Sequence, residues 1–411
     1  MGGGVIGVST AYYLARDGHE VTVIERRPGA AEETSFANAG IVATGHCFSW
    51  ASPRAPLILL ESLFRRDTAL RLRLKADPRM WAWCLRFLAN CTRARNRANT
   101  LRKLGLCIYS QEALAELRRD TNIAYDANPR GALYFYRDGG QLDTAVGNAA
   151  LLNENGLAVE ALDADGCVAI EPALGPARDA IAGAVYCPTD ESGDSHAFSR
   201  NLAGVCEAMG VRFRFATTIT GLRAAGDVIE GVDTDRGAVS GDVYVLALGS
   251  YSPLVARGAG IALPVYPVKG YSMTVPTGGR DGAPSIPCVD EHRLVAFCRL
   301  GERFRVTATA EFAGYDTHFE PGDFTQMLAV ARETFPRAGD YGAPRSWACQ
   351  RPMPPDGPPV LGRGRHRNLF FNTGHGHLGW TMCCGTGRVT ADLISGRAPD
   401  IDLAGLTIDR F

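Results

Sequence analysis

Apolar residues at the start of this chain gather in short blocks that glycine and polar residues separate. Residues 8–17 predict a helix that ends at Gly18, and the run HEVTVIE (19–25) predicts a short apolar strand. A helix followed at once by an apolar strand is typical of an α/β fold.

Two later blocks extend this pattern. Residues 210–250 predict successive strands broken at Gly and Asp, and the last of these strands is apolar and ends at Gly249. Residues 369–372 predict a strand, which a glycine-rich turn and a helix running towards Gly396 follow. The chain is therefore expected to combine α/β and α+β structure.

The glycines before the first helix form the pattern G-x-G-x-x-G, with Gly2, Gly4 and Gly7 at its glycine positions. Such glycines permit a tight turn and close approach of the backbone to a pyrophosphate at a helix N-terminus. Glu25 follows about twenty residues later, where a carboxylate can accept hydrogen bonds from ribose hydroxyls. A merely flexible terminus is the alternative, which the helix, strand and acid in this order disfavour.

Two features around this motif raise further expectations. A buried strand normally precedes such a turn, but only Met1 stands before these glycines. We therefore expect that translation begins a few codons upstream. Arg26 and Arg27 either lie near the adenosine ribose or pyrophosphate or are solvated.

Composition limits the class of protein. The chain has 411 residues, enough for one large or two ordinary domains, and a formal net charge of −1, which gives no overall attraction to nucleic acid. Its 12 cysteines form no C-x-x-C pair and no zinc-like quartet, which favours a reduced, cytoplasmic protein without a metal. There is no apolar run of membrane-spanning length and no signal peptide.

Residues 53–103 form a basic stretch rich in Leu, Trp and Arg and poor in acids. Its apolar clusters LILLESLF and MWAWCLRFLANC, flanked by arginines, are expected of helices in a membrane interface, and such peripheral contact would lie on the inner face of the cytoplasmic membrane. A helical insertion with a buried apolar face and solvated arginines is an equally good interpretation. A nucleic-acid interface is disfavoured because the aromatic residues do not interleave with a basic groove-binding motif.

Several motifs together resemble one family. GGGVIGVSTAYYLARDGHEVTVIER, ETSFANAG, VYPVKGYSMTVP, RPMPPDGPPVLGR and NTGHGHLGWTMCCGTG run nearly from end to end. They are similar to bacterial D-amino acid dehydrogenases of the small-subunit type, within the superfamily of D-amino acid oxidase, glycine oxidase and sarcosine oxidase. The resemblance implies FAD as cofactor, with a split Rossmann-like FAD-binding domain interleaved with a substrate domain on a large, mostly antiparallel sheet.

This resemblance also suggests a division of the chain. The FAD-binding domain is expected to comprise residues 1–50, 150–225, 240–260 and 355–411. The substrate domain is expected to comprise residues 51–149, 226–239 and 261–354, with 53–103 as the basic helical insertion.

Cofactor contacts are expected from three further segments. The polar, glycine-rich stretch 33–45 suits backbone N–H groups laid along a long ligand, although an ordinary surface loop is the alternative. The resemblance places the backbone of Ile219 beside the adenine and Gly249 close to the cofactor. The helix after the C-terminal turn would direct its N-terminus at the flavin. The residues expected to bind are Ser35, Asn38, Ala39, Gly40, Ile41, Gly374, His375, Gly376, Leu378, Gly379, Trp380 and Thr381. A metal at His375 and His377 is disfavoured because no third ligand is nearby.

Candidate substrate residues lie between residues 266 and 351. Arg351 resembles the superfamily's carboxylate-binding arginine, since one guanidinium can fix a carboxylate through two hydrogen bonds. Tyr266 and Tyr271 offer phenols that could close over the substrate, and Lys269 lies either near the flavin or in solvent. His292 is a further pocket candidate, although a satisfied or exposed histidine is the favoured interpretation, and His46 has the same two interpretations.

Cys349 raises a separate question about the flavin. Monomeric sarcosine oxidases hold their flavin through a cysteine near the comparable site. We therefore consider covalent attachment, but a small buried thiol is the favoured interpretation.

The resemblance predicts oxidative deamination of a D-amino acid to the imino or 2-oxo acid, with hydride transfer from Cα to flavin N5. A quinone or another acceptor would then take the electrons. An oxygen-using oxidase of glycine, an N-substituted glycine or a D-imino acid such as proline or hydroxyproline is the alternative. A flavin-binding protein without turnover is a more remote one.

Overall fold

The computed structural model describes residues 2–64, 70–73 and 76–411. Helix α1 (Val5–Arg16) begins earlier than predicted, because Gly4 is its N-cap and Gly7 lies inside its first turns. The predicted strand is β1 (Thr22–Ile24), which pairs in parallel with β8 (Arg212–Arg214). The N–H of Gly2 donates to the carbonyl of Ile24 at 2.9 Å, so the glycine turn begins beside β1.

A three-stranded sheet stands next to this turn. It contains β11 (Tyr244–Leu246), β18 (Leu369–Thr373) and β17 (Val360–Arg363) in that order, with β11 and β18 parallel. A Cβ on Gly2 would lie only 2.4 Å from the carbonyl oxygen of Ala247, directly after β11. The glycine turn is therefore wedged between β1 and β11.

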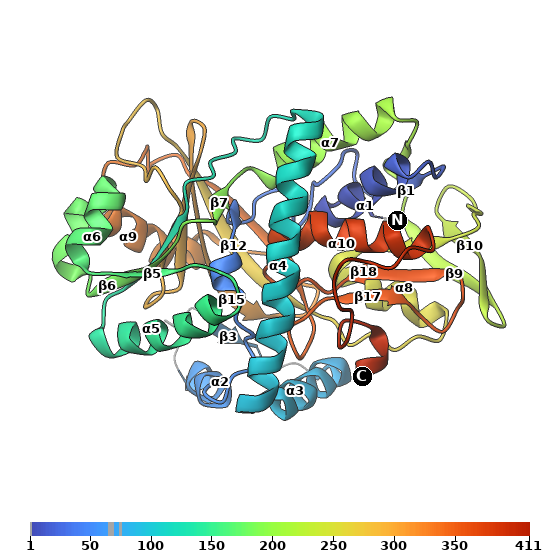
Figure 1. Ribbon diagram of the computed structural model, residues 1–411, viewed down its shortest axis with the longest axis horizontal. Coiled ribbons are helices and arrows are strands. Elements are labelled where there is room, and N and C mark those ends of the chain that lie inside the picture. Colours follow the sequence, from blue (N-terminus) through green and yellow to red (C-terminus); the bar gives the residue numbers. More distant parts are fainter. Residues whose placement is uncertain (1, 65–69, 74–75) are drawn as a thin grey trace.

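Three helices from distant parts of the sequence pack around this region: α1, α7 (Ser195–Ala208) and α10 (Gly379–Ile394). Their apolar side chains share one core cluster, which includes Val8, Phe198 and Trp380. The predicted C-terminal strand, glycine turn and helix are thus confirmed, and α10 lies beside α1, the first helix of the chain (Figure 1).

A nine-stranded sheet forms the second part of the molecule. Its order is β16, β12, β15, β14, β13, β4, β6 and β5, with β3 paired to β15. Only the β13–β4 and β15–β3 pairs are parallel, which confirms the large, mostly antiparallel sheet. The strands are β3 (Leu70–Leu72), β4 (Ala132–Tyr136), β5 (Glu160–Leu162), β6 (Gly183–Cys187), β12 (Tyr266–Pro276), β13 (Cys288–Asp290), β14 (Val295–Leu300), β15 (Arg303–Phe312) and β16 (Arg345–Met353).

The division into two interleaved domains stays a prediction. Because β5 and β6 extend the nine-stranded sheet, their pairing favours assigning residues 160–187 to the substrate side. The remaining elements are β2 (Ile41–Val42), β7 (Glu191–Ser192), β9 (Ile219–Ala225), β10 (Val228–Thr234), α5 (Gly139–Glu154), α6 (Ala164–Ile170), α8 (Ser252–Gly258) and α9 (Thr325–Thr334).

The basic stretch folds into α2 (Ala55–Phe64), α3 (Pro78–Asn90) and the start of α4 (Arg93–Thr121), with part of it outside the described residues. Asp77 caps α3, since its side chain accepts from the N–H of Arg79. In Figure 1, α4 runs across the molecule and α2 and α3 lie at one end of it. Among the described residues, no helix combines the length and apolar character needed to cross a bilayer.

Candidate functional site

A cavity of about 1080 Å³ lies between the glycine turn and the nine-stranded sheet. Most of the predicted site residues form its wall, although they come from segments that are far apart in the sequence. These residues are Gly2, Gly4, Glu25, Arg26, Ser35, Asn38, Ala39, Ile41, Ile219, Gly249, Tyr271, Arg351, His375, Gly376, Leu378, Gly379 and Trp380. The cavity is large enough for a ligand of dinucleotide size.

At one end of the cavity, the glycine turn and Glu25 are joined directly. The N–H of Gly3 donates to Glu25 Oε2 at 2.7 Å, and that of Arg27 to Oε1 at 2.8 Å. Burial raises the pKa of Glu25 despite these two bonds, which lower it. A Cβ on Gly7 would lie 1.8 Å from the Gly2 carbonyl oxygen, so Gly7, outside the cavity wall, lets α1 pack onto the turn.

Arg26 and Arg27 both face Glu33, which the sequence analysis did not single out. Arg26 Nε lies 2.6 Å from Glu33 Oε1, and Arg27 Nε lies 2.8 Å from the same oxygen. The guanidinium of Arg26 also stacks over Tyr251, 3.8 Å from the ring centroid. Arg26 thus lines the cavity with its charge balanced by Glu33 and its guanidinium stacked on an aromatic ring. Arg27 is exposed and lies outside the wall.

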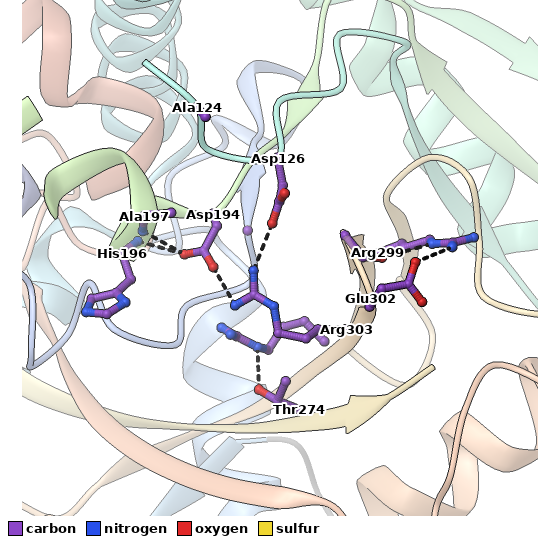
Figure 2. Close-up of polar contacts among 12 residues, drawn as sticks. Ala124, Asp126, Asp194, His196, Ala197, Thr274, Arg299, Glu302 and Arg303 are labelled. Carbon is purple, nitrogen blue, oxygen red and sulfur yellow. Dashed lines mark hydrogen bonds and ion pairs between the residues drawn. The ribbon is translucent and has the colours of Figure 1, made fainter. Parts of the chain in front are cut away.

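Arg305 holds the loop of residues 33–41, and Arg303 on the same strand ties β15 to the cap of α7. Figure 2 shows Arg303 directed at both Asp126 and Asp194, at 2.8 and 2.7 Å, while Asp194 caps α7. Arg305, two residues further along β15, donates to the carbonyl oxygen of Asn38 at 2.7 Å. Since these contacts join β15, α7 and the loop, the tertiary structure fixes the backbone of this segment.

The C-terminal turn closes the middle of the cavity. The N–H of Gly376 donates to the carbonyl of Pro352 at 2.9 Å, which places this turn beside β16. His375 Nε2 lies 3.1 Å from Thr386 Oγ1, and burial lowers the pKa of His375 to about 3. Gly40, Gly374 and Thr381 lie outside the wall; Thr381 accepts from the N–H of Ala43.

The His377 ring stacks on Trp50, with ring centroids 5.0 Å apart. In the part of the chain that the structure describes, no three His, Cys, Asp or Glu side chains gather around a possible metal position.

Arg351 lies on β16 opposite Val268 of β12, and it is partly exposed towards the cavity. Its Nη1 donates to the carbonyl of Thr309 at 3.0 Å. Thr309 has a φ of 64°, at a bulge in the β12–β15 pairing, and this conformation is costly for a β-branched residue. A Cβ on Gly270 would lie 2.4 Å from Arg351 Nη1, so only glycine leaves room for the guanidinium.

The charge of Arg351 has no counter-ion in the cavity wall. Within residues 2–64, 70–73 and 76–411, no carboxylate lies within ion-pair distance of its guanidinium, and only the Cys349 thiol opposes the lowering of its pKa by burial. A guanidinium stays protonated in proteins. Arg351 is therefore a partly buried cation that an anionic ligand group would neutralise.

Three of the predicted catalytic residues lie outside the wall. Lys269 is buried and donates to the carbonyl of His318 at 2.8 Å, with its Nζ 3.5 Å from Glu311 Oε2. Tyr266 packs against Trp83, and His292 is exposed. Tyr266 and His292 therefore do not face the cavity, and Lys269, expected near the flavin or in solvent, is buried in the sheet instead. Gly270, not its neighbours, faces Arg351.

Tyr271 lines the cavity in part, but its hydroxyl is committed elsewhere. It donates to the carboxylate of Glu311, the same buried acid that faces Lys269. Its phenol therefore anchors β12 to β15. Cys349 is also in the wall, with burial raising the pKa of its thiol to about 11, which disfavours the nucleophilic thiolate. Covalent flavin attachment there gains no support, and a small buried thiol stays the favoured interpretation.

Comparisons with known proteins identify the family. Residues 1–393 match the family described as FAD dependent oxidoreductase. The chain belongs to this family. It is 47% identical to D-amino acid dehydrogenase 2 of Mesorhizobium japonicum over 407 residues, covering 99% of this chain and 98% of the relative. It is also 47% identical to the D-amino acid dehydrogenase of Methylobacterium radiotolerans, covering 100% and 98%.

Solved structures support the same fold. Glycine oxidase from Geobacillus kaustophilus superposes with a TM-score of 0.75 at 24% identity, covering 100% of this chain and 97% of that chain. L-Proline dehydrogenase from P. horikoshii gives 0.74 at 18% identity, covering 99% and 95%. At such identities these similarities concern the fold alone.

The oxidoreductase has a wall that fits FAD. Gly2 and Gly7 lie too close to neighbouring backbone for a Cβ, which is the tight turn that a pyrophosphate requires at the N-terminus of α1. A Cβ on Gly249 would meet nothing within 4 Å, so the wall leaves space there. FAD would be held by the turn, Glu25, loop 33–41 and the C-terminal turn.

Other residues of the wall were missed or underestimated from the sequence. Gly270 stands inside a quoted motif, but its role depends on Arg351 packing against it. Thr309 carries no local signal, since its strained conformation arises from the bulge. Two further residues line the cavity: His46, for which the sequence favoured a role outside the pocket, and Trp50, which the sequence did not single out.

Proposed function

We propose that this enzyme oxidises a D-amino acid to its imino acid, which water then converts to the 2-oxo acid, with FAD as the bound cofactor. The observation that carries the proposal is the uncompensated guanidinium of Arg351 in the wall of the FAD cavity. Full-length relatives at 47% identity that are named D-amino acid dehydrogenases support it.

The chain's own residues would act by binding and orientation. Arg351 would bind the substrate carboxylate by donating two parallel hydrogen bonds to it, and Thr309 and Gly270 would hold the guanidinium in place. FAD supplies the two-electron acceptor for the hydride that leaves Cα. Since fixing the carboxylate orients Cα, positioning would supply much of the rate enhancement.

An anaerobic panel tests this proposal. Purified holoenzyme is mixed without oxygen with D-amino acids, their L enantiomers, glycine, sarcosine and D-proline, and loss of flavin absorbance is followed. We expect rapid bleaching by D-amino acids only. Bleaching by glycine, sarcosine or D-proline but not by the other D-amino acids would favour the alternative, an oxidase of glycine, an N-substituted glycine or a D-imino acid. Failure of every compound to bleach the flavin would contradict the proposal and favour a binding protein.

The electron acceptor is a separate question, which the surface of α2 and α3 bears on. Ile58 lines the cavity and is also 48% exposed, so the cavity reaches the surface at α2. Exposed apolar side chains stand on both α2 and α3: Leu57, Leu60, Trp81, Leu85 and Leu88. Exposed arginines flank them, including Arg54, Arg79 and Arg86.

We infer that this apolar mouth faces a bilayer with anionic lipids and that a membrane quinone accepts the electrons. Apolar side chains with flanking arginines are typical of helices in a membrane interface. The test is re-oxidation of the anaerobically reduced enzyme by a short-chain ubiquinone, by a water-soluble dye and by air. We expect the quinone to be much faster than air. Fast re-oxidation by air with stoichiometric peroxide would favour the oxidase alternative.

A further inference from the structure

A group of polar rings and an acid lines the cavity beside the His377 turn; we call it the His46 cluster, comprising His46, Glu291, Tyr134 and His377. His46 Nε2 lies 3.0 Å from Glu291 Oε1. The imidazole stacks on Tyr134, with centroids 5.6 Å apart and planes within 17°, and meets the edge of His377 at 5.7 Å. One ring nitrogen of His46 is thus paired with an acid at the cavity wall.

The turn that carries His46 is fixed by a buried carboxylate. Asp190 accepts from the N–H of Thr44 at 2.7 Å and from that of Gly45 at 3.2 Å. The hydroxyl of Tyr134, whose ring supports His46, donates to the same acid at 2.5 Å. The position of the imidazole is therefore determined by three segments of the fold. Such preorganisation is typical of functional groups.

The cluster is adjacent to the strand that carries Arg351. His377 follows Gly376, whose N–H donates to the carbonyl of Pro352, the residue after Arg351. Trp50 stacks on one face of His377 and His46 meets its edge, and the charges of both His46 and Arg351 act on the His377 ring. Arg351, His377, His46 and Glu291 all line the same cavity.

The chemistry of the substrate requires that its ammonium group lose a proton before hydride transfer. An amino acid in water carries an ammonium group, and its nitrogen lone pair must be free before hydride can leave Cα. We propose that His46, oriented by Glu291, accepts the proton from the ammonium of the substrate bound at Arg351. The inference rests on the proposed function.

In this step the N–H bond of the ammonium breaks and a bond from that proton to the imidazole forms, leaving a neutral amine. The freed lone pair is then available to form the C=N bond as hydride leaves Cα, and bound FAD would supply the acceptor. His46 afterwards returns its proton to water.

Charged groups on every side set the proton affinity of His46. Burial and the ammonium of Lys103 on α4 lower its pKa, and Glu291 and Asp190 raise it, with a net rise above the ordinary value. His377 on the adjoining turn is neutral, because burial lowers its pKa well below the usual range. The base is thus suited to receive a proton near neutral pH.

The test is the pH profile of anaerobic flavin reduction at saturating D-amino acid, from about pH 6 to about pH 10. For the wild-type holoenzyme we expect a rate that rises with pH to a plateau. Glu291→Gln removes the charge that raises the His46 pKa, so the rising limb should move to lower pH by about one unit. His46→Gln should slow reduction about 100-fold near neutrality and move the limb towards the pKa of the free amine.

A second His–Glu pair provides the control. His318 and Glu320 are 2.7 Å apart on the surface, outside the cavity wall, and His318→Gln should leave the profile unchanged. If His46→Gln does not fold, the shift of the rising limb in Glu291→Gln still decides whether His46 accepts the proton.

An unchanged profile in either cluster variant, with wild-type bleaching intact, would overturn this inference alone. If the wild-type enzyme is bleached by no amino acid, the proposed function fails, and this inference fails with it.

Discussion

At the residue scale, the cavity depends on single glycines whose missing side chains make room for function. Gly270 leaves the volume that Arg351 occupies, and Gly7 lets α1 rest on the first turn. The Gly7 role follows from a local motif, which the sequence reveals. The Gly270 role requires knowing that β16 lies beside β12, about 80 residues away in the chain.

We predict that Gly270→Ala lowers kcat/KM for a D-amino acid about 100-fold, because its Cβ would displace the guanidinium that orients the substrate. The loss should arise largely in KM, and the FAD content should stay near that of the wild type. Steady-state kinetics and the flavin absorbance ratio measure both quantities. Gly175→Ala, where a Cβ meets nothing within 4 Å, serves as the control. Wild-type kinetics for Gly270→Ala would contradict the placement of Arg351.

At the element scale, helix α1 is held by its contact with the glycine turn. A Cβ on Gly7 would meet the Gly2 carbonyl at 1.8 Å, so Gly7→Ala should force the two apart. We expect purified Gly7→Ala to retain less than about a tenth of the wild-type flavin, because a displaced helix end no longer faces the pyrophosphate.

The matched variant is Gly204→Ala in α7, where the added Cβ has open space. It should retain full flavin and gain about 0.5–1 kcal/mol, since Ala is favoured over Gly within helices. A fully flavin-loaded Gly7→Ala would refute the packing argument.

Helix α4 carries a buried lysine whose ionisation affects stability. Lys103 is 2% exposed, donates to the carbonyl of Phe48 at 3.0 Å, and has a pKa lowered to about 8 by burial. Between about pH 8 and the unfolded value near 10.5, the unfolded chain binds the proton and the native protein does not. Stability from this group therefore rises with pH across that window and is lost as pH falls through 8.

We predict that Lys103→Met changes the pH dependence of thermal unfolding. Relative to the variant, the wild type should gain about 3 kcal/mol between pH 8 and pH 10.5. Thermal midpoints of the two proteins, measured side by side across this range, test the prediction. Arg97→Met, an exposed cation on the same helix, should show a constant difference from the wild type. A constant difference for Lys103→Met would show that the lysine is charged when buried.

At the scale of the whole molecule, the two chain ends form one side of the cavity and the nine-stranded sheet forms the other. Helices α2 and α3, which carry the exposed apolar side chains of the mouth, lie at one end of α4 (Figure 1). We predict that the holoenzyme sediments with vesicles containing phosphatidylglycerol, and that Leu57→Glu with Leu85→Glu reduces this binding at least about 10-fold. These side chains are 63% and 69% exposed, and burying one leucine contributes about 1.5–3 kcal/mol.

Val146→Glu provides the comparison, because Val146 is an exposed apolar residue on α5. It should bind vesicles as the wild type does and keep the same quinone activity. Equal sedimentation of all three proteins would remove the support for a membrane-facing mouth.

The sequence by itself determined the features that depend on neighbouring residues. The glycine turn, Glu25, the C-terminal strand and helix and the helical nature of much of 53–103 follow from local spacing, because turns and caps are short-range. Many of the residues that line the cavity could be predicted from local motifs or from the family resemblance, which also added Arg351 and the mostly antiparallel sheet.

Only the tertiary structure decided which side chains meet. Lys269 and Tyr271 both contact Glu311, a buried acid about 40 residues away in the chain. These contacts hold the polar ends of both side chains within the sheet, so neither is free to bind substrate. The Thr309 bulge, the Arg303–Asp194 contact and the His46–Glu291 pair likewise join distant segments. Sequence spacing carries no signal for such contacts, because they follow from strand register and from burial of charge, which exist only once the chain has folded.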